Sequence, residues 1–135
     1  MDLEILEIAS NTDNNKILEK HTHSSKLKNS MCGDEMSVTL NVKNLKILDL
    51  GYQCKSCVYC QASASLLAKL SKKEKLSQIK ELILISLNFF EKDSKKFPKK
   101  WSVLSKIFNK KNFSRKECIQ LPFRTLSKAL RNIYE

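Results

Sequence analysis

The stretch MSVTLNVKNLKILDLG, residues 36–51, alternates apolar and polar residues on either side of a short polar break. Residues 36–42 bring every second side chain, from Met36 onward, to one face, which predicts a half-buried strand. Lys43-Asn44 is typical of a tight turn, and a second alternating run follows it, with Leu45 and Ile47 on one face and Leu48 and Leu50 on the other. We therefore expect an antiparallel hairpin that ends near Gly51.

Helical spacing of apolar residues follows this hairpin. Residues 57–70 are rich in Ala, Ser and Leu and predict a helix that begins at about Cys57. Ser71, with Glu74 three residues later, resembles a capping box and predicts the start of a long second helix that runs to Leu87.

Two prolines mark the remaining C-terminal elements. Pro98 lies in a charged surface connection over residues 92–100, ahead of a short amphipathic helix that begins at Trp101. Pro122 suits the first turn of a helix, so we expect the last helix to begin near it, with Cys118 ahead of the helix.

The N-terminal third has weaker patterns. Residues 2–9 predict a short helix that brings Leu3, Leu6 and Ile5 to one face. Residues 16–29 are polar and show no periodicity, which predicts a loop that contains His21 and His23 as solvated side chains.

The length of 135 residues fits one domain over residues 1–135, since single cores commonly reach roughly 100–150 residues. The order of elements predicts an α+β fold, a small antiparallel sheet with helices packed on it. No apolar run approaches the roughly 20 residues of a membrane span, and no secretory signal is visible. We expect a cytoplasmic protein with no membrane partner.

The net charge of +11 raises the question of nucleic acid binding. Of the 25 basic residues, only Arg115, Arg124 and Arg131 are arginine, the residue that dominates base readout. Because the lysines are scattered along the chain, a solvated lysine surface explains the charge, and no nucleic acid partner is expected. A basic zinc-stabilised module that binds nucleic acid stays as an alternative function.

Five cysteines cannot all pair within one chain, so metal or thiol chemistry is favoured over disulfides. Cys32 and Asp34 flank a glycine just ahead of the first strand, Cys57 lies at the start of a helix, and Cys118 precedes the last helix. Ends of elements are where a fold can aim distant side chains at one point. A set of three sulfurs and one oxygen suits tetrahedral zinc or an iron–sulfur cluster.

A second interpretation takes Cys54, Cys57 and Cys60 as a separate CxxCxxC metal motif. A helix that begins near Cys57 would leave Cys54 outside it and carry Cys60 one turn on. Cys60 is more typical of a small buried apolar residue.

Three segments together resemble the NifU/IscU-like family of iron–sulfur cluster assembly scaffolds. They are MCGDEMSVTLNV (residues 31–42), CVYCQASASLL (57–67) and RKECIQLPFRTLSKAL (115–130), and NTDNNKIL (11–18) is similar to a degraded Asn-Pro-x-Asn segment of that family. The long interval between Cys57 and Cys118, with an insertion at residues 92–112, resembles the SufU branch. Glu117 in place of a histidine and the missing Leu-Pro-Pro-Val segment also favour SufU over IscU, whereas Ser56 replaces a usual glycine.

The resemblance implies zinc on Cys32, Asp34, Cys57 and Cys118, with Arg115 in a basic position that gives electrostatic support. It implies a pyridoxal-phosphate cysteine desulfurase of the SufS type as partner, which exchanges into the zinc shell and frees a cysteine to accept sulfur. Cys32 is the expected acceptor and Cys118 the alternative. Downstream apo-proteins or scaffolds would take the sulfur next.

A stand-alone enzyme is not expected, because the chain shows no Ser/His/Asp set, Gly-rich phosphate loop or paired acid-base carboxylates. At most the chain is an accessory sulfurtransferase. The alternative within the same family is a scaffold that assembles a labile 2Fe–2S cluster on the same ligands.

Overall fold

The predicted hairpin is present in the computed structural model, which describes residues 3–29, 33–91 and 96–131. Strands β2 (Glu35–Lys43) and β3 (Lys46–Lys55) pair antiparallel. Their turn lies one residue later than predicted, at Asn44 and Leu45, which both have positive φ. That conformation matches the twist of the strands it joins.

A β-bulge explains which side chains of β3 are buried. Asn41 pairs with Asp49 but Val42 pairs with Ile47, so Leu48 is an extra residue in β3. The bulge reverses the alternation, so Ile47 and Leu50 are both buried. The prediction that separated these two residues onto opposite faces is wrong, because an unbroken alternation cannot include a bulge.

Strand β3 continues past Gly51, where the predicted hairpin ended, to Lys55. A Cβ at Gly51 would lie 2.4 Å from the Lys16 carbonyl oxygen, so only glycine lets the N-terminal segment cross the sheet here. The extended strand includes Cys54, which therefore lies close to the start of the first long helix.

A third strand, β1 (His23–Lys28), pairs antiparallel with β2 and gives the strand order β1-β2-β3. The predicted loop over residues 16–29 is therefore wrong for residues 23–28 and correct for residues 16–22. Side chains of β1 alternate between half-buried and exposed, yet nearly all are polar, so no apolar alternation marks the strand. The Ser25 hydroxyl donates to the Thr125 carbonyl oxygen at 2.6 Å and attaches this edge strand to a helix.

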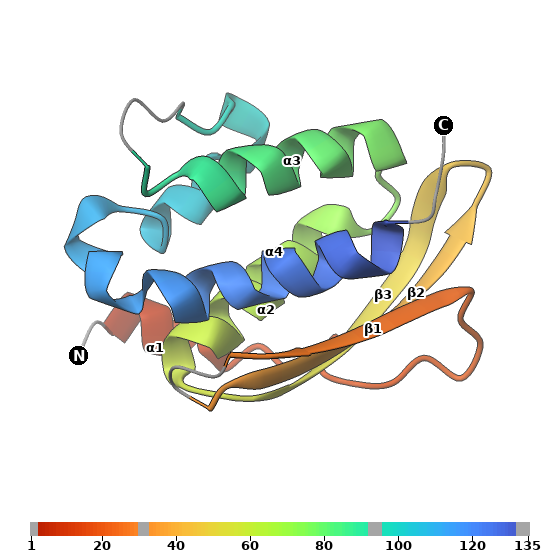
Figure 1. The fold of residues 1–135 in the computed structure, drawn as a ribbon, viewed down its shortest axis with the longest axis horizontal. Coiled ribbons are helices and arrows are strands. Elements are labelled where there is room, and N and C mark those ends of the chain that lie inside the picture. Colours follow the sequence, from red (N-terminus) through yellow and green to blue (C-terminus); the bar gives the residue numbers. More distant parts are fainter. Residues whose placement is uncertain (1–2, 30–32, 92–95, 132–135) are drawn as a thin grey trace.

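Helices cover one face of the sheet, as Figure 1 shows, and the predicted α+β fold is confirmed. Helix α1 (Leu3–Ala9) packs on α2 (Val58–Ser71). Ile5 is fully buried, whereas Leu3 is 79% exposed and Leu6 is 42% exposed, so the predicted apolar face of α1 is wrong. Helix α2 lies at the centre of the packing, with most of its residues buried.

The remaining helices begin at other residues than predicted. Ser71 ends α2 and donates its hydroxyl to the Leu67 carbonyl oxygen, so it does not cap α3 (Leu76–Asn88). Two 3₁₀ helices follow, η1 (Lys99–Lys106) and η2 (Lys110–Arg115).

Helix α4 (Lys116–Leu130) begins directly after η2, with Pro122 inside it. The predictions that it starts near Pro122 and that Cys118 precedes it are both wrong. A proline in a helix interior lacks its own N–H bond and its ring crowds the carbonyl four residues earlier, and here the buried face of α4 outweighs that cost. Within the described residues, no helix has the length and apolar character needed to cross a membrane.

Candidate metal centre

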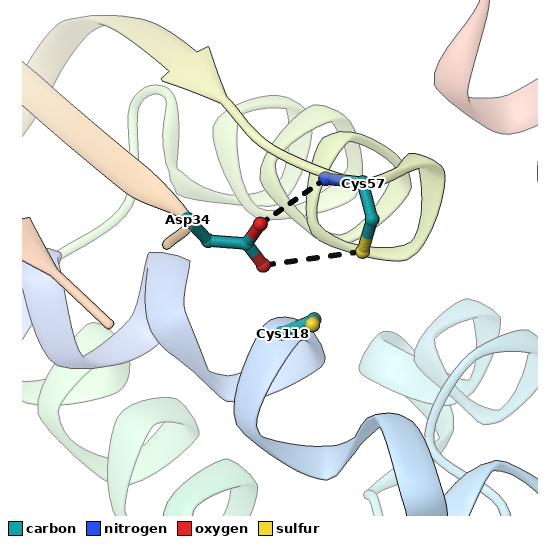
Figure 2. A group of neighbouring side chains, drawn as sticks. All are labelled: Asp34, Cys57 and Cys118. Carbon is teal, nitrogen blue, oxygen red and sulfur yellow. Dashed lines mark hydrogen bonds between the residues drawn. The ribbon is translucent and has the colours of Figure 1, made fainter. Parts of the chain in front are cut away.

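Asp34, Cys57 and Cys118 come together at one end of the domain. One ligating atom from each lies within 4.8 Å of the others, and Figure 2 shows the three side chains facing a common point. Asp34 immediately precedes β2, Cys57 immediately precedes α2, and Cys118 is the third residue of α4. Residues far apart in the sequence thus supply one site, as the sequence predicts for these three.

Asp34 is the oxygen donor of the group. It is 5% exposed, and its Oδ1 accepts a hydrogen bond from the Cys57 backbone N–H at 3.3 Å. Its Oδ2 lies 3.9 Å from the Cys57 sulfur, which donates to it. Gly33, with φ of +75°, supplies the left-handed turn that directs the chain into β2 at Asp34. A buried carboxylate is costly without a cation or several donors, so a metal ion between it and the sulfurs would offset that cost.

Cys57 occupies the N-cap position of α2. Its backbone is extended, with φ of −71° and ψ of 167°, and its carbonyl accepts the Gln61 N–H at 3.1 Å as the first bond of the helix. The positive end of the α2 dipole therefore points at the site. An anionic ligand set suits this position.

Cys118 is 5% exposed and lies in the first turn of α4. The Ser63 hydroxyl of α2 donates to the carbonyl oxygen of Ile119 at 2.6 Å, and both groups are buried. This bond joins the helix that follows Cys57 to the helix that carries Cys118. It is one of the contacts that hold these two helices together.

Two other residues, Cys32 and Arg115, were predicted to belong to the site. Cys32 lies outside the described residues, so its ligand role stays a prediction. Arg115 is the exposed N-cap of α4, and its guanidinium carbon lies 5.5 Å from the centroid of the Tyr59 ring in the first turn of α2. Arg115 is thus positioned between the N-terminal ends of the two helices that bear the cysteines.

Cys54 and Cys60 form a separate pair. Their sulfurs lie 3.4 Å apart, and the Ser56 hydroxyl is 2.8 Å from the Cys54 sulfur. The Cys60 thiol, and more weakly the Ser56 hydroxyl, hydrogen-bonds Cys54 and lowers its pKa, whereas the neighbouring Cys54 and burial raise the pKa of Cys60.

This pairing argues against the interpretation of Cys54, Cys57 and Cys60 as one CxxCxxC metal motif. Among the described residues, Cys57 gathers with Asp34 and Cys118, and neither Cys54 nor Cys60 belongs to that group. The prediction that Cys60 is buried is confirmed, at 0% exposed. Its contact with Cys54 was missed, although one cysteine at a strand end and another in the next helical turn is a sequence signal for it.

The donor set of two sulfurs and one carboxylate oxygen fits a borderline metal ion. Zinc takes sulfur and oxygen ligands in tetrahedral sites, and iron–sulfur clusters take cysteine sulfurs. His21 is exposed and His23 lies half-buried in β1, and neither belongs to the group. The sequence predicts both histidines to be solvated side chains in a loop. This prediction is correct for His21, whereas His23 lies in strand β1 and not in a loop.

The fold and this site define a small α+β domain in which Asp34, Cys57 and Cys118 form a candidate metal site. Residues 2–96 match the family described as the NifU-like N terminal domain. The chain therefore belongs to the family of NifU-like N-terminal domains, a family of iron–sulfur cluster assembly scaffolds.

The chain is also similar to a protein of known sequence and to solved structures. An uncharacterized protein of Borreliella burgdorferi is 31% identical over 120 residues, which cover 87% of this chain and 81% of the other. The N-terminal part of a NifU-like protein from Brucella abortus has the same fold, with a TM-score of 0.88, 17% identity and coverage of 96% and 91% of the two chains. A putative scaffold protein for the SUF system from Fervidobacterium islandicum has a TM-score of 0.87, 22% identity and 96% coverage of each chain.

Proposed function

We propose that this chain is a SufU-type assembly protein, a zinc-dependent acceptor and relay of persulfide sulfur from a pyridoxal-phosphate cysteine desulfurase. The observation that carries the proposal is the convergence of Asp34, Cys57 and Cys118 within 4.8 Å. The likeness in fold to the Fervidobacterium islandicum protein, described as a scaffold for the SUF system, adds support at the level of the fold. The family itself interacts with cysteine desulfurases.

Zinc would be held by Asp34, Cys57 and Cys118, with Cys32 as the fourth ligand. When bound, it keeps cysteine sulfurs deprotonated and close together at neutral pH. The Cys57 N–H holds the Asp34 carboxylate in its orientation toward the sulfurs. The α2 N-terminus adds a favourable field for the anionic ligands.

Sulfur acceptance is a thiol exchange. The Cys32 thiolate attacks the outer sulfur of the desulfurase persulfide, the sulfur–sulfur bond breaks, and the desulfurase cysteine leaves as a thiolate. The outer sulfur remains on Cys32 as a new persulfide. Cys118 is the alternative acceptor, and Arg115 stabilises the negative charge that arrives with the sulfur.

A scaffold that assembles a 2Fe–2S cluster on the same ligands is the second candidate function. The family assignment favours it, because the family binds metal and iron–sulfur clusters. In that case the cluster is cargo, and the buried carboxylate of Asp34 is the weak ligand that release requires. Metal content separates the two functions.

The test is anaerobic purification without added metal, followed by measurement of zinc, iron and acid-labile sulfide per chain. We expect about one zinc and no sulfide in the wild type, and loss of zinc in Asp34→Ala and Cys118→Ala. Cys60→Ala, which removes a buried cysteine outside the site, should keep its zinc. Iron with matching sulfide would favour the scaffold function, and equal zinc in all variants would exclude this site.

Sulfur transfer is tested in the same preparations with a SufS-type desulfurase and cysteine. Wild-type protein should raise desulfurase turnover, and Cys32→Ala should not. Full stimulation by Cys32→Ala would reject Cys32 as acceptor. No nucleic acid partner is proposed for the scattered lysines.

A further inference from the structure

A second sulfur pair lies beside the proposed metal centre. Cys54 is near the end of β3 and Cys60 is in the first turn of α2, so the two cysteines bracket Cys57 in the sequence. Their sulfurs lie 3.4 Å apart, and the Ser56 hydroxyl lies 2.8 Å from the Cys54 sulfur. A disulfide bond is about 2 Å long, so a small side-chain rotation would join them.

The two cysteines differ in access. Cys54 is half-buried, whereas Cys60 is 0% exposed and its sulfur contacts that of Cys54. The hydrogen bonds from Cys60 and Ser56 lower the pKa of Cys54, and the thiolate is the nucleophilic form of cysteine. The pair thus has one thiol for attack and one for resolution.

We propose that Cys54 and Cys60 form a dithiol centre that reduces the sulfane sulfur of a persulfide to sulfide. The proposal rests on the proposed function, in which this chain handles persulfide sulfur. It supplies a step that sulfur relay alone lacks, because sulfane sulfur must gain two electrons to become the sulfide of an iron–sulfur cluster.

The first step is transfer to Cys54. The Cys54 thiolate attacks the outer sulfur of a persulfide R–S–SH, the sulfur–sulfur bond of the donor breaks, and R–SH leaves with the proton. Cys54 then carries the sulfur as an anionic persulfide. Charge and atoms balance, and no electrons have yet been lost by the chain.

The second step is resolution by Cys60. Its sulfur contacts the Cys54 sulfur itself, which is the inner atom of the new persulfide. Attack at that atom forms the Cys54–Cys60 disulfide and expels the outer sulfur as HS⁻, which takes the Cys60 proton. The two thiols are oxidised by two electrons and the sulfane sulfur is reduced by two. A dithiol reductant of the thioredoxin class must restore the pair for a second turnover.

The test uses the full chain with its bound metal, reduced and freed of reductant under anaerobic conditions. Glutathione persulfide is the probe, sulfide release is measured, and peptide mass spectrometry locates the sulfur and any disulfide. Wild type should release about one sulfide per chain above background and form the Cys54–Cys60 disulfide. Cys60→Ala should retain the added sulfur on Cys54 without that release, and Cys54→Ala should do neither.

Equal sulfide release by Cys60→Ala and wild type, or no Cys54–Cys60 disulfide in the wild type, would overturn the proposal. Because Cys60 is fully buried, zinc content and thermal unfolding check that the variant folds, and disulfide mapping in the wild type does not depend on any variant.

Desulfurase with cysteine, applied to the same samples, separates the two proposals. Sulfur found on Cys32 or Cys118 without sulfide release would reject the dithiol centre and keep the relay. Sulfur on no cysteine of the wild type, together with no sulfide release above background, would reject the relay, and the result with glutathione persulfide would then decide the dithiol chemistry by itself.

Discussion

At the scale of single residues, the contact with Cys60 bears on the pKa of Cys54. The pKa of Cys54 is lowered first by the hydrogen bond from Cys60 and less by that from Ser56. Without the Cys60 donor the thiolate loses its main support, so Cys60→Ala should raise this pKa and slow alkylation of Cys54 at neutral pH. Ser56→Ala should shift the profile in the same direction by less. Iodoacetamide labelling across a pH series, with Cys54 followed by peptide mass spectrometry, measures both shifts, and a larger effect of Ser56→Ala would contradict this account.

The grouping of Asp34, Cys57 and Cys118 was predictable because residue type and element ends both point to these three residues. Asp34, Cys57 and Cys118 are ligating types at the ends of elements, and they resemble the motif positions of a known family. The Cys54–Cys60 contact was not predictable in the same way. It depends on how far β3 extends and on the angle at which α2 leaves it, and neither follows from the alternation of apolar residues.

At the scale of elements, the hydrogen bond from Ser63 of α2 to the Ile119 carbonyl of α4 holds two ligand-bearing helices together. Ser63→Ala should cost about 1 kcal/mol of unfolding free energy and also weaken zinc binding, because Cys118 loses its anchor to α2. Ser71→Ala is the matched control. Ser71 is equally buried and in the same helix, but its hydroxyl bonds within α2, to Leu67. Urea unfolding and competitive zinc titration measure the two effects, and equal loss of zinc affinity in both variants would disprove the coupling.

Elements with strong apolar periodicity were predicted and those without it were not. The hairpin and α2 follow directly from alternation and helical spacing. Strand β1 is a polar edge strand whose place depends on pairing with β2, a contact that no local pattern records. Helix α4 shows the opposite error, because Pro122 is a strong local signal that the buried face of the helix overrides.

At the scale of the whole molecule, metal binding should stabilise the entire fold. The three gathered ligands come from the chain before β2, the start of α2 and the first turn of α4, so one ion would join the end of the central strand to two helices. A ligand that binds only the folded state stabilises it by about 2.7 kcal/mol at a free concentration of 100 times its Kd. We expect the melting temperature to rise by roughly 10 °C with zinc, from about 4 °C per kcal/mol for a chain of this size.

Variants that lack one ligand test whether this stabilisation by zinc comes from the proposed site. Differential scanning calorimetry of chelator-treated protein, with and without zinc, should show the rise in the wild type and in Cys60→Ala but not in Cys118→Ala. Cys60 and Cys118 are both buried, so the two variants remove similar apolar contacts and differ in whether a ligand is lost. A zinc-dependent rise that persists in Cys118→Ala would mean that the ion binds elsewhere on the chain. A rise lost only in Cys118→Ala would mean that the ion stabilises the fold by joining its distant segments, and the metal centre would then be as much a part of the fold as of its chemistry.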